Sequence, residues 1–274
     1  MPEGSGQILN TRSLRTAYRR LADMLRPGLA VLDVGCGTGA ITRGMAAAVA
    51  PRGLILGVDV DARFIDEARR THGDIPGLLF AICDAQRLPF RDRFDVVTAA
   101  RMLQWLANPL WALQSMAAAL KPGGWMAILD YNHEKIAWQP PPPQSMQTFY
   151  KAFLRWRAEA GMDNAIADHL RDMLADLELE DVVETPQHET THRIDADFVT
   201  RIGLWAEVAA SRGHQMVADG IISEVQRATA EAEYRMWMRD SAESQTLYVL
   251  SVEGRRAEPA NLPVAKLTVT MEAC

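Results

Sequence analysis

Three closely spaced glycines could form a loop that cradles a ligand. Gly35, Gly37 and Gly39 directly follow the apolar run 30–34, an arrangement typical of a buried strand, a tight turn and the start of a helix. Glycine has no Cβ, so such a turn can take positive φ values and let a ligand approach the backbone closely. We interpret the segment as a binding loop, because a bare strand-to-helix turn would need fewer glycines.

An acidic side chain stands at or near the end of each of three predicted strands. Asp33 precedes the glycines, Asp59 follows the run 54–58, and Asp84 follows the run 78–83. The carboxyl ends of parallel strands meet at one edge of a sheet, so these acids should lie near the glycine loop. Their charge favours a cationic ligand and would repel a pyrophosphate.

A dinucleotide is the main alternative ligand. Gly35, Gly37 and Ala40 satisfy the loose form of the nucleotide fingerprint, which would make the protein an NAD-dependent dehydrogenase. Asp33, two residues before the first glycine, disfavours this alternative, because its carboxylate would face the arriving pyrophosphate.

The segment 33–39, with the sequence DVGCGTG, resembles the first motif of the class I S-adenosylmethionine-dependent methyltransferases. It is most similar to the small-molecule branch (type 11) that includes the ubiquinone and menaquinone C-methyltransferases. The resemblance covers residues 11–130 with specific motifs, including KPGG at 121–124. It implies S-adenosyl-L-methionine as the cofactor, which carries a sulfonium and an ammonium but no phosphate. It also implies methyl transfer to a small organic acceptor.

The same resemblance assigns roles to the candidate residues. The glycine loop would carry the methionine part of the cofactor, Asp59 would hold the ribose hydroxyls, and Asp84 with the Ala85 backbone would meet the adenine amine. An early arginine, Arg12 or Arg15, would meet the methionine carboxylate. The residues expected to bind the cofactor are Asp33, Gly35, Cys36, Gly37, Thr38, Gly39, Asp59, Val60, Asp84, Ala85, Arg101, Tyr18 and Arg12.

Strands and helices alternate through the first half of the chain, with crossovers long enough for parallel pairing. The pattern predicts a doubly wound α/β sheet with strands at 30–34, 54–58, 78–83, 94–99 and 125–129, preceded by a helix over 11–25. The resemblance implies a Rossmann-like, mostly parallel sheet of seven strands whose last strand is antiparallel, and we place that strand at 244–252. A single domain over 1–256 and a tail over 257–274 are expected.

Three segments are expected to form a cap over the acceptor, namely residues 1–26, 131–160 and 195–240. A proline-rich stretch at 139–143 is stiff and should hold the following helix away from the sheet. Apolar residues then recur at helical spacing, and Ser223 with Gln226 has the pattern of a capping box. The aromatic and polar candidates for the acceptor walls are Trp105, Tyr131, Trp138, Trp205, His214 and Trp237.

The cluster 130–134 follows the fifth predicted strand, where an acceptor would meet the methyl group. Its His133 is the candidate catalytic residue, because imidazole titrates near neutrality and could take a proton from a hydroxyl or an amine. The alternative is a histidine that only hydrogen-bonds to loop backbone. Nearby, Gln104 and Trp105 stand where many relatives carry two histidines, so the acceptor of those relatives cannot be carried over.

The motif HETTH at 188–192 fits the pattern of zinc peptidases. That chemistry needs a helix, whereas Pro186 and two β-branched threonines favour an extended chain. In an extended chain the two histidines lie about 13 Å apart, too far to share one metal. We therefore expect no metal site.

Composition narrows the partners. The 274 residues carry a net charge of −6, so no overall basic field favours nucleic acid. The chain lacks a long apolar run, which argues against a membrane span, and its three cysteines lack C-x-x-C spacing, which suggests the cytoplasm. A small-molecule acceptor is expected and a homodimer is compatible with the sequence. A cofactor-binding regulator or scaffold without catalysis stays open.

Overall fold

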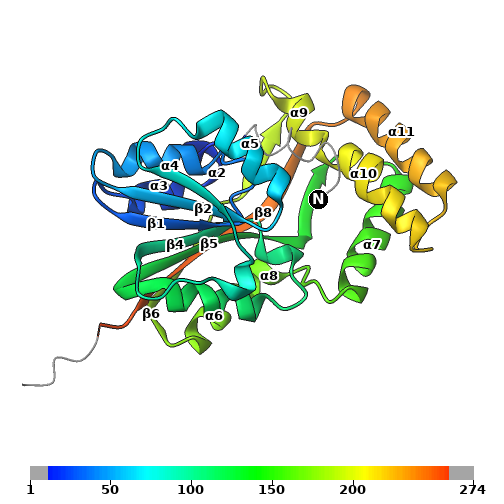
Figure 1. The fold of residues 1–274 in the computed structure, drawn as a ribbon. Coiled ribbons are helices and arrows are strands. Elements are labelled where there is room, and N and C mark those ends of the chain that lie inside the picture. Colours follow the sequence, from blue (N-terminus) through cyan, green and yellow to red (C-terminus); the bar gives the residue numbers. More distant parts are fainter. Residues whose placement is uncertain (1–11, 259–274) are drawn as a thin grey trace, which may run out of the picture.

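A twisted sheet with helices on both faces forms the body of the protein, and further helices cover one end of it (Figure 1). The computed structural model describes residues 12–258, so residues 1–11 and most of the predicted tail lie outside the described residues. The strands are β1 Ala30–Val34, β2 Leu54–Asp59, β3 Leu78–Ile82, β4 Phe94–Ala100, β5 Leu120–Gln139, β6 Leu179–Pro186, β7 Glu189–His192 and β8 Ser244–Arg256.

The strand order across the sheet is β3-β2-β1-β4-β5-β8-β6. The first five strands are parallel, and β8 is antiparallel to both β5 and β6. The order reverses beside β1, so the carboxyl ends of β1 and β4 border a crevice at which ligands bind in folds of this kind. The Rossmann-like, mostly parallel sheet and its antiparallel strand are confirmed.

The sheet has eight strands where seven were predicted. The additional strand is β7, which pairs with residues 244–247 of β8, while β6 pairs with residues 250–256 of the same strand. The two therefore share one edge of β8 in succession. β5 is also much longer than the predicted 125–129, because its second half continues to pair with β8 as far as Gln139.

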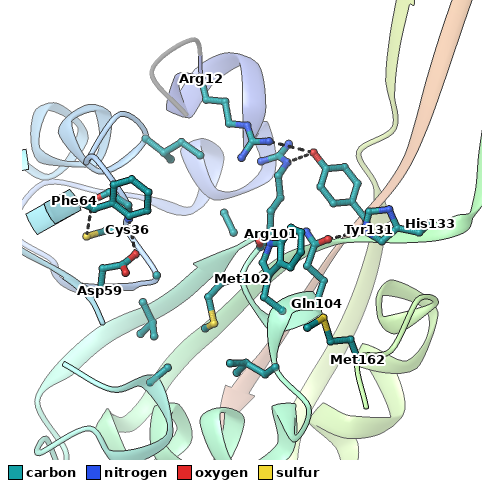
Figure 2. Close-up of a pocket in the computed structure, with 18 of the residues that line it drawn as sticks. Arg12, Cys36, Asp59, Phe64, Arg101, Met102, Gln104, Tyr131, His133 and Met162 are labelled. Atoms are coloured by element: carbon teal, nitrogen blue, oxygen red, sulfur yellow. Dashed lines mark hydrogen bonds between the residues drawn. The ribbon is translucent and has the colours of Figure 1, made fainter. Parts of the chain in front are cut away.

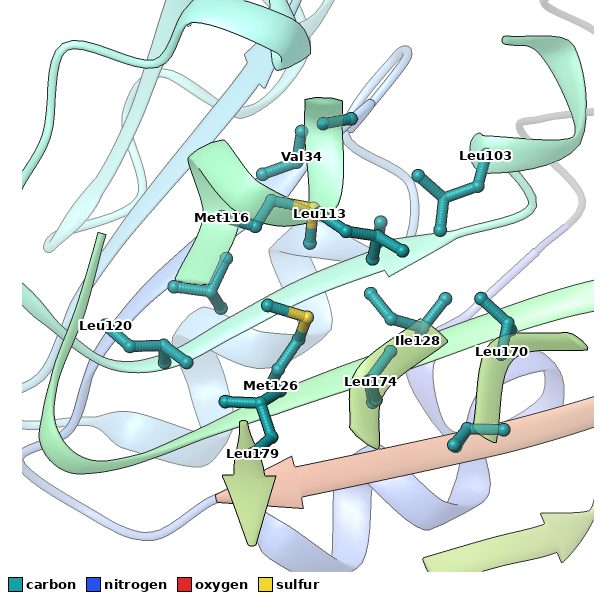
Figure 3. Close-up of a cluster of buried hydrophobic side chains, with 14 of the residues drawn as sticks. Val34, Leu103, Leu113, Met116, Leu120, Met126, Ile128, Leu170, Leu174 and Leu179 are labelled. Atoms are coloured by element: carbon teal, nitrogen blue, oxygen red, sulfur yellow. The ribbon is translucent and has the colours of Figure 1, made fainter. Parts of the chain in front are cut away.

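Two apolar layers enclose the sheet. One face packs against the helices α2 Leu14–Ala17, α3 Arg19–Met24, α4 Thr42–Val49 and α5 Ala62–His72. The other face packs against α6 Pro109–Ala119 and α8 Ile166–Asp176, whose leucines meet Met126 and Ile128 of β5 (Figure 3). The strands are thus buried on both sides, which explains their continuous apolar runs.

The predicted helix over 11–25 is interrupted. It divides into α2 and α3 at Tyr18, whose φ of −150° and ψ of 63° are not helical. The Tyr18 ring is fully buried against the sheet. Packing of this large side chain overrides the helical periodicity of the sequence, which is a general limit of propensity arguments.

The cap has an apolar core of its own. It contains α7 Gln144–Glu159, α9 Phe198–Ile202, α10 Leu204–Ala218 and α11 Glu224–Asp240. The predicted capping box is confirmed, since Ser223 and Gln226 exchange side chain to backbone hydrogen bonds at the start of α11. The helical part of the cap after Asp197 is divided into α9 and α10 at Gly203.

Leu113→Ala should lower the free energy of unfolding by about 3 kcal/mol, because this fully buried side chain fills the layer between α6 and the sheet. Leu110→Ala on the same helix is the matched control, since Leu110 is 38% exposed and should change stability by less than about 0.5 kcal/mol. Urea unfolding of both variants checks the difference. Equal losses would contradict this account of the core.

Candidate functional site

A cavity of about 680 Å³ lies between the carboxyl ends of the strands and the cap, and Figure 2 shows part of it. One end is lined by the glycine loop and the residues that follow β2 and β3. The other end is lined by the loop after β4, by β5 and by the cap helices α7 and α10. Its size is that of a small-molecule site.

The glycine loop has the predicted backbone. Gly35, Gly37 and Gly39 have φ values of +75°, +54° and +79°, which side chains with a Cβ rarely adopt. The space beside two of them is occupied by the protein itself. A Cβ on Gly35 would lie 2.4 Å from Met102, and one on Gly39 would lie 2.8 Å from Phe80. Gly39 serves the packing of α5 and β3 and does not line the cavity.

Two carboxylates lie at the loop. Asp33 is buried and accepts a hydrogen bond of 2.6 Å from Thr42 Oγ1. Burial raises the pKa of the Asp33 carboxyl to about 6, and the charge of Asp59 contributes. Asp59 accepts from the backbone N–H groups of Gly37 and Asp61, each at 2.9 Å. The loop therefore carries negative charge that a cation would stabilise.

The third carboxylate borders the same end of the cavity. Asp84 accepts from the backbone N–H of Gln86 at 2.9 Å and so caps the short 3₁₀ helix η1, Ala85–Arg87. This cap fixes the direction in which the chain leaves β3. Asp84 and Ala85 line the cavity together with Val60.

Two arginines and a tyrosine form a polar cluster beside the loop after β4. Arg101 Nε donates to Tyr131 Oη at 2.8 Å, and Arg12 Nη2 approaches the same oxygen at 3.4 Å (Figure 2). Arg101 also forms an ion pair with Glu189 of β7. Its Nη1 is buried and has no hydrogen-bond partner among residues 12–258, and its φ of +58° is a strained backbone value.

His133 lies inside β5 and lines the cavity. It is 9% exposed, its Nε2 lies 2.5 Å from Gln104 Oε1, and its backbone N–H donates to the Asn164 carbonyl at 2.7 Å. Burial holds the pKa of His133 well below its usual value, and the positive charge of Arg157 adds to this effect. The imidazole is therefore neutral at physiological pH.

Aromatic side chains from the cap and the strand ends enclose the far end of the cavity. The predicted wall residues Trp105, Tyr131 and Trp205 line it, together with Phe153 and Trp156. Trp205 packs edge-on against Phe153, with ring centroids 5.8 Å apart. An apolar or aromatic ligand would fit these walls.

Several predicted site residues do not reach the cavity. Tyr18 is buried on one face of the sheet, Trp138 and Trp237 pack within the core of the cap, and the His214 side chain is 59% exposed beside Glu224. Each of these side chains lies on a face of its helix or strand that is directed toward the protein core or toward solvent, away from the cavity. Apart from Tyr18 and Gly39, the predicted cofactor residues line the cavity.

Sequence reasoning missed other lining residues, among them Gln104, Met162 and Arg212. Gln104 follows β4 in the short helix η2, Leu103–Trp105, and its signal in the sequence was that it stands, with Trp105, where many relatives carry two histidines. Phe153 and Trp156 also line the cavity, and helical spacing alone does not distinguish a core stripe from a cavity wall.

The HETTH segment is extended, as predicted. Glu189–His192 forms β7, and His188 Nδ1 just before it accepts from the Val249 backbone N–H at 3.2 Å. Glu189 forms an ion pair with Arg101, which lines the cavity. The motif thus contributes one partner of this ion pair.

A family model described as a methyltransferase domain matches residues 31–124. The matched segment begins in β1, contains the glycine loop and the carboxylates at 33, 59 and 84, and ends at the turn before the paired part of β5. Residues 31–124 form a class I methyltransferase domain.

Curated relatives of this methyltransferase domain include C-methyltransferases of quinone biosynthesis. The ubiquinone/menaquinone biosynthesis C-methyltransferase UbiE of Burkholderia vietnamiensis is 36% identical over 121 residues, covering 42% of this chain and 47% of the relative. That of Ectopseudomonas mendocina is 38% identical over 112 residues, covering 39% and 44%. The chain thus spans less than half the length of the curated relatives it matches.

Solved structures share the fold at low identity. YcgJ of Bacillus subtilis has a TM-score of 0.57 and 17% identity, with 93% of this chain and 100% of that chain covered. Phosphoethanolamine N-methyltransferase 2 of Haemonchus contortus, in complex with S-adenosylhomocysteine, has a TM-score of 0.55 and 17% identity, with 94% and 54% covered. This likeness extends the fold assignment beyond the matched segment.

None of the helices within residues 12–258 is both long and apolar enough to cross a bilayer. This is the structural counterpart of the absence of a long apolar run in the sequence.

Asp33→Asn should stabilise the methyltransferase domain at pH 8 by about 3 kcal/mol and should have little effect near pH 4. The folded carboxyl has a pKa of about 6 against 3.8 unfolded, so the folded state binds more protons between these values. Stability is therefore lost as pH rises from about 4 to 6, and the neutral amide avoids that loss. Urea unfolding at both pH values measures the difference. A variant less stable at pH 8 would contradict the raised pKa.

Proposed function

We propose that the protein transfers a methyl group from S-adenosyl-L-methionine to a small, largely apolar organic acceptor beneath the helical cap. The observation that carries this proposal is one cavity with carboxylates and a glycine loop at one end and aromatic walls with His133 at the other. The methyltransferase family match and the carboxylate positions favour this ligand over a dinucleotide.

The residues present fit this cofactor. Asp33 and Asp59 supply negative charge near the glycine loop, where burial already disfavours an uncompensated carboxylate. The guanidinium groups of Arg12 and Arg101 supply positive charge for a carboxylate, and the Nη1 of Arg101 is a buried donor without a partner among the described residues. A zwitterionic methionine group next to a sulfonium matches this arrangement of opposite charges.

The roles of the individual residues follow from their places. Asp59 would hold the ribose hydroxyls, exchanging its bonds to the Gly37 and Asp61 backbone for bonds to ligand. Asp84 and the Ala85 backbone would meet the adenine. When bound, the cofactor supplies a methyl group that is attached to a sulfonium. The sulfur is the leaving group and becomes a neutral thioether.

The remaining part of the cavity would orient the acceptor. Trp105, Trp205 and Phe153 exclude water and present flat apolar surfaces, which favours a defined angle of approach to the methyl group. His133 is the side chain placed to accept a proton from the acceptor, because its imidazole is neutral at physiological pH.

Asp59→Asn should weaken S-adenosylhomocysteine binding by about 10- to 100-fold, because a charge-assisted hydrogen bond contributes about 1.5–3 kcal/mol. Asp66→Asn is the matched control, since the Asp66 side chain lies on α5 and is 73% exposed. Isothermal titration calorimetry measures both affinities, and circular dichroism verifies folding.

Three results would overturn the proposal. The first is unchanged affinity in the Asp59 variant, and the second is tighter binding of NAD than of S-adenosylhomocysteine. The third is binding of S-adenosylmethionine without methyl transfer to any component of a metabolite extract, which would indicate a cofactor-binding regulator.

A further inference from the structure

The side-chain amide of Gln104 has an orientation that its neighbours determine. Its Nε2 donates to the carbonyl oxygen of Arg101 at 3.2 Å, and its Oε1 lies 2.5 Å from His133 Nε2 (Figure 2). A carbonyl oxygen can only accept, so the amide nitrogen must face Arg101 and the amide oxygen must face the imidazole. The amide oxygen also only accepts. The neutral imidazole therefore carries its hydrogen on Nε2, and Nδ1 is left with a free lone pair.

The main chain of Gln104 is held equally firmly. Its backbone N–H donates to Asp130 Oδ2 at 3.2 Å, and its carbonyl accepts from Arg157 Nη2 at 2.8 Å. Gln104 is 2% exposed. The buried side-chain amide cannot flip without breaking its hydrogen bonds to Arg101 and His133. The fold therefore determines the tautomer of His133.

Groups from β5, η2, α7, α10 and the loop after β4 surround the imidazole. The rings of Tyr131, Phe153 and Trp205 lie 5.4, 6.3 and 6.1 Å from it, centroid to centroid. The polar and charged groups nearby are Gln104, Asp130, Tyr150 through its bond to the His133 carbonyl, Arg101 through Tyr131, and Arg157. Arg157 is fully buried, and its positive charge is the one that lowers the pKa of His133.

This surrounding also restricts the acceptor. A protonated amine beside His133 would meet the positive charge of Arg157 and has no lone pair with which to attack the methyl group. A hydroxyl is neutral and can donate its hydrogen to a lone pair. The observations therefore favour a hydroxyl acceptor over an ammonium acceptor.

We propose that Gln104 is a positioning residue that holds His133 as the Nε2–H tautomer, so that Nδ1 accepts the proton of an acceptor hydroxyl. This inference rests on the proposed methyl transfer. The hydroxyl proton passes to Nδ1 as the oxygen gains the methyl group, while sulfur keeps the electron pair of the broken carbon–sulfur bond. The positive charge lost by the sulfonium appears on the imidazolium, so the net charge in the cavity does not change.

Nitrogen NMR of protein labelled with ¹⁵N-histidine, saturated with S-adenosylhomocysteine, tests the tautomer without turnover. In the unaltered protein at pH 7, His133 should show the Nε2–H and bare Nδ1 signals of a neutral imidazole. Gln104→Glu should raise the pKa of His133 by about 1–3 units, because an adjacent carboxylate favours imidazolium. Gln104→Met should mix the two tautomers. Gln86→Glu, at the opposite end of the cavity, is the matched control and should leave the His133 signals unchanged.

A pair of probes tests which atom faces the acceptor. Titration with 2-naphthol should shift the Nδ1 signal, because a hydroxyl donates to that lone pair, whereas 2-methoxynaphthalene has no hydroxyl hydrogen and should not. An Nδ1–H tautomer, unchanged signals in Gln104→Met, or an Nδ1 signal that 2-naphthol leaves unchanged would each overturn the inference. Calorimetry of the unaltered protein with S-adenosylhomocysteine tests the proposed function separately. Absence of binding would contradict the proposed function, whereas the His133 signals report on the tautomer.

Discussion

The attachment of the cap to the sheet depends on the contacts of the buried Arg157 guanidinium. From α7 it donates to the Gln104 carbonyl and to Asn164 Oδ1, each at 2.8 Å, and its Cζ lies 4.9 Å from the centre of the Trp105 ring. A buried cation is tolerated only where hydrogen bonds and aromatic faces replace its water. These contacts therefore hold the first helix of the cap, the loop after β4 and the segment before α8 in one arrangement.

Buried charges also divide the cavity into a negative end and a positive end. Asp33 and Asp59 make the glycine-loop end negative, whereas Arg157 makes the surroundings of His133 positive. Burial strengthens both effects, since few water molecules screen the charges. The proposed cofactor, which carries a cation and a carboxylate in one molecule, would suit this division of charge.

The long antiparallel pair β5 and β8 supplies the rigid frame for this site. β5 carries Tyr131 beyond the parallel part of the sheet, paired with Val249 of β8, whereas His133 lies in the irregular stretch between Asn132 and Ala137, where its backbone N–H donates to the Asn164 carbonyl. β7 adds to the outer edge of β8 and brings Glu189 to Arg101. Strand pairing at Tyr131 and the hydrogen bond from the His133 backbone to Asn164 hold the two residues more precisely than an unbonded loop would, which suits a site where an in-line approach matters.

Local patterns in the sequence determined the α/β alternation, the glycine loop with its positive φ values, the three acidic strand ends and the capping box at Ser223, because each depends on neighbours a few residues apart. Tertiary structure alone decided which aromatic residues line the cavity, since helical spacing places Phe153 and Trp237 on apolar faces without saying what those faces meet. It also decided the break at Tyr18, the extension of β5 and the role of Gln104. Each of these depends on contacts between residues distant in the chain, and such contacts outweigh local preference once the side chains are buried.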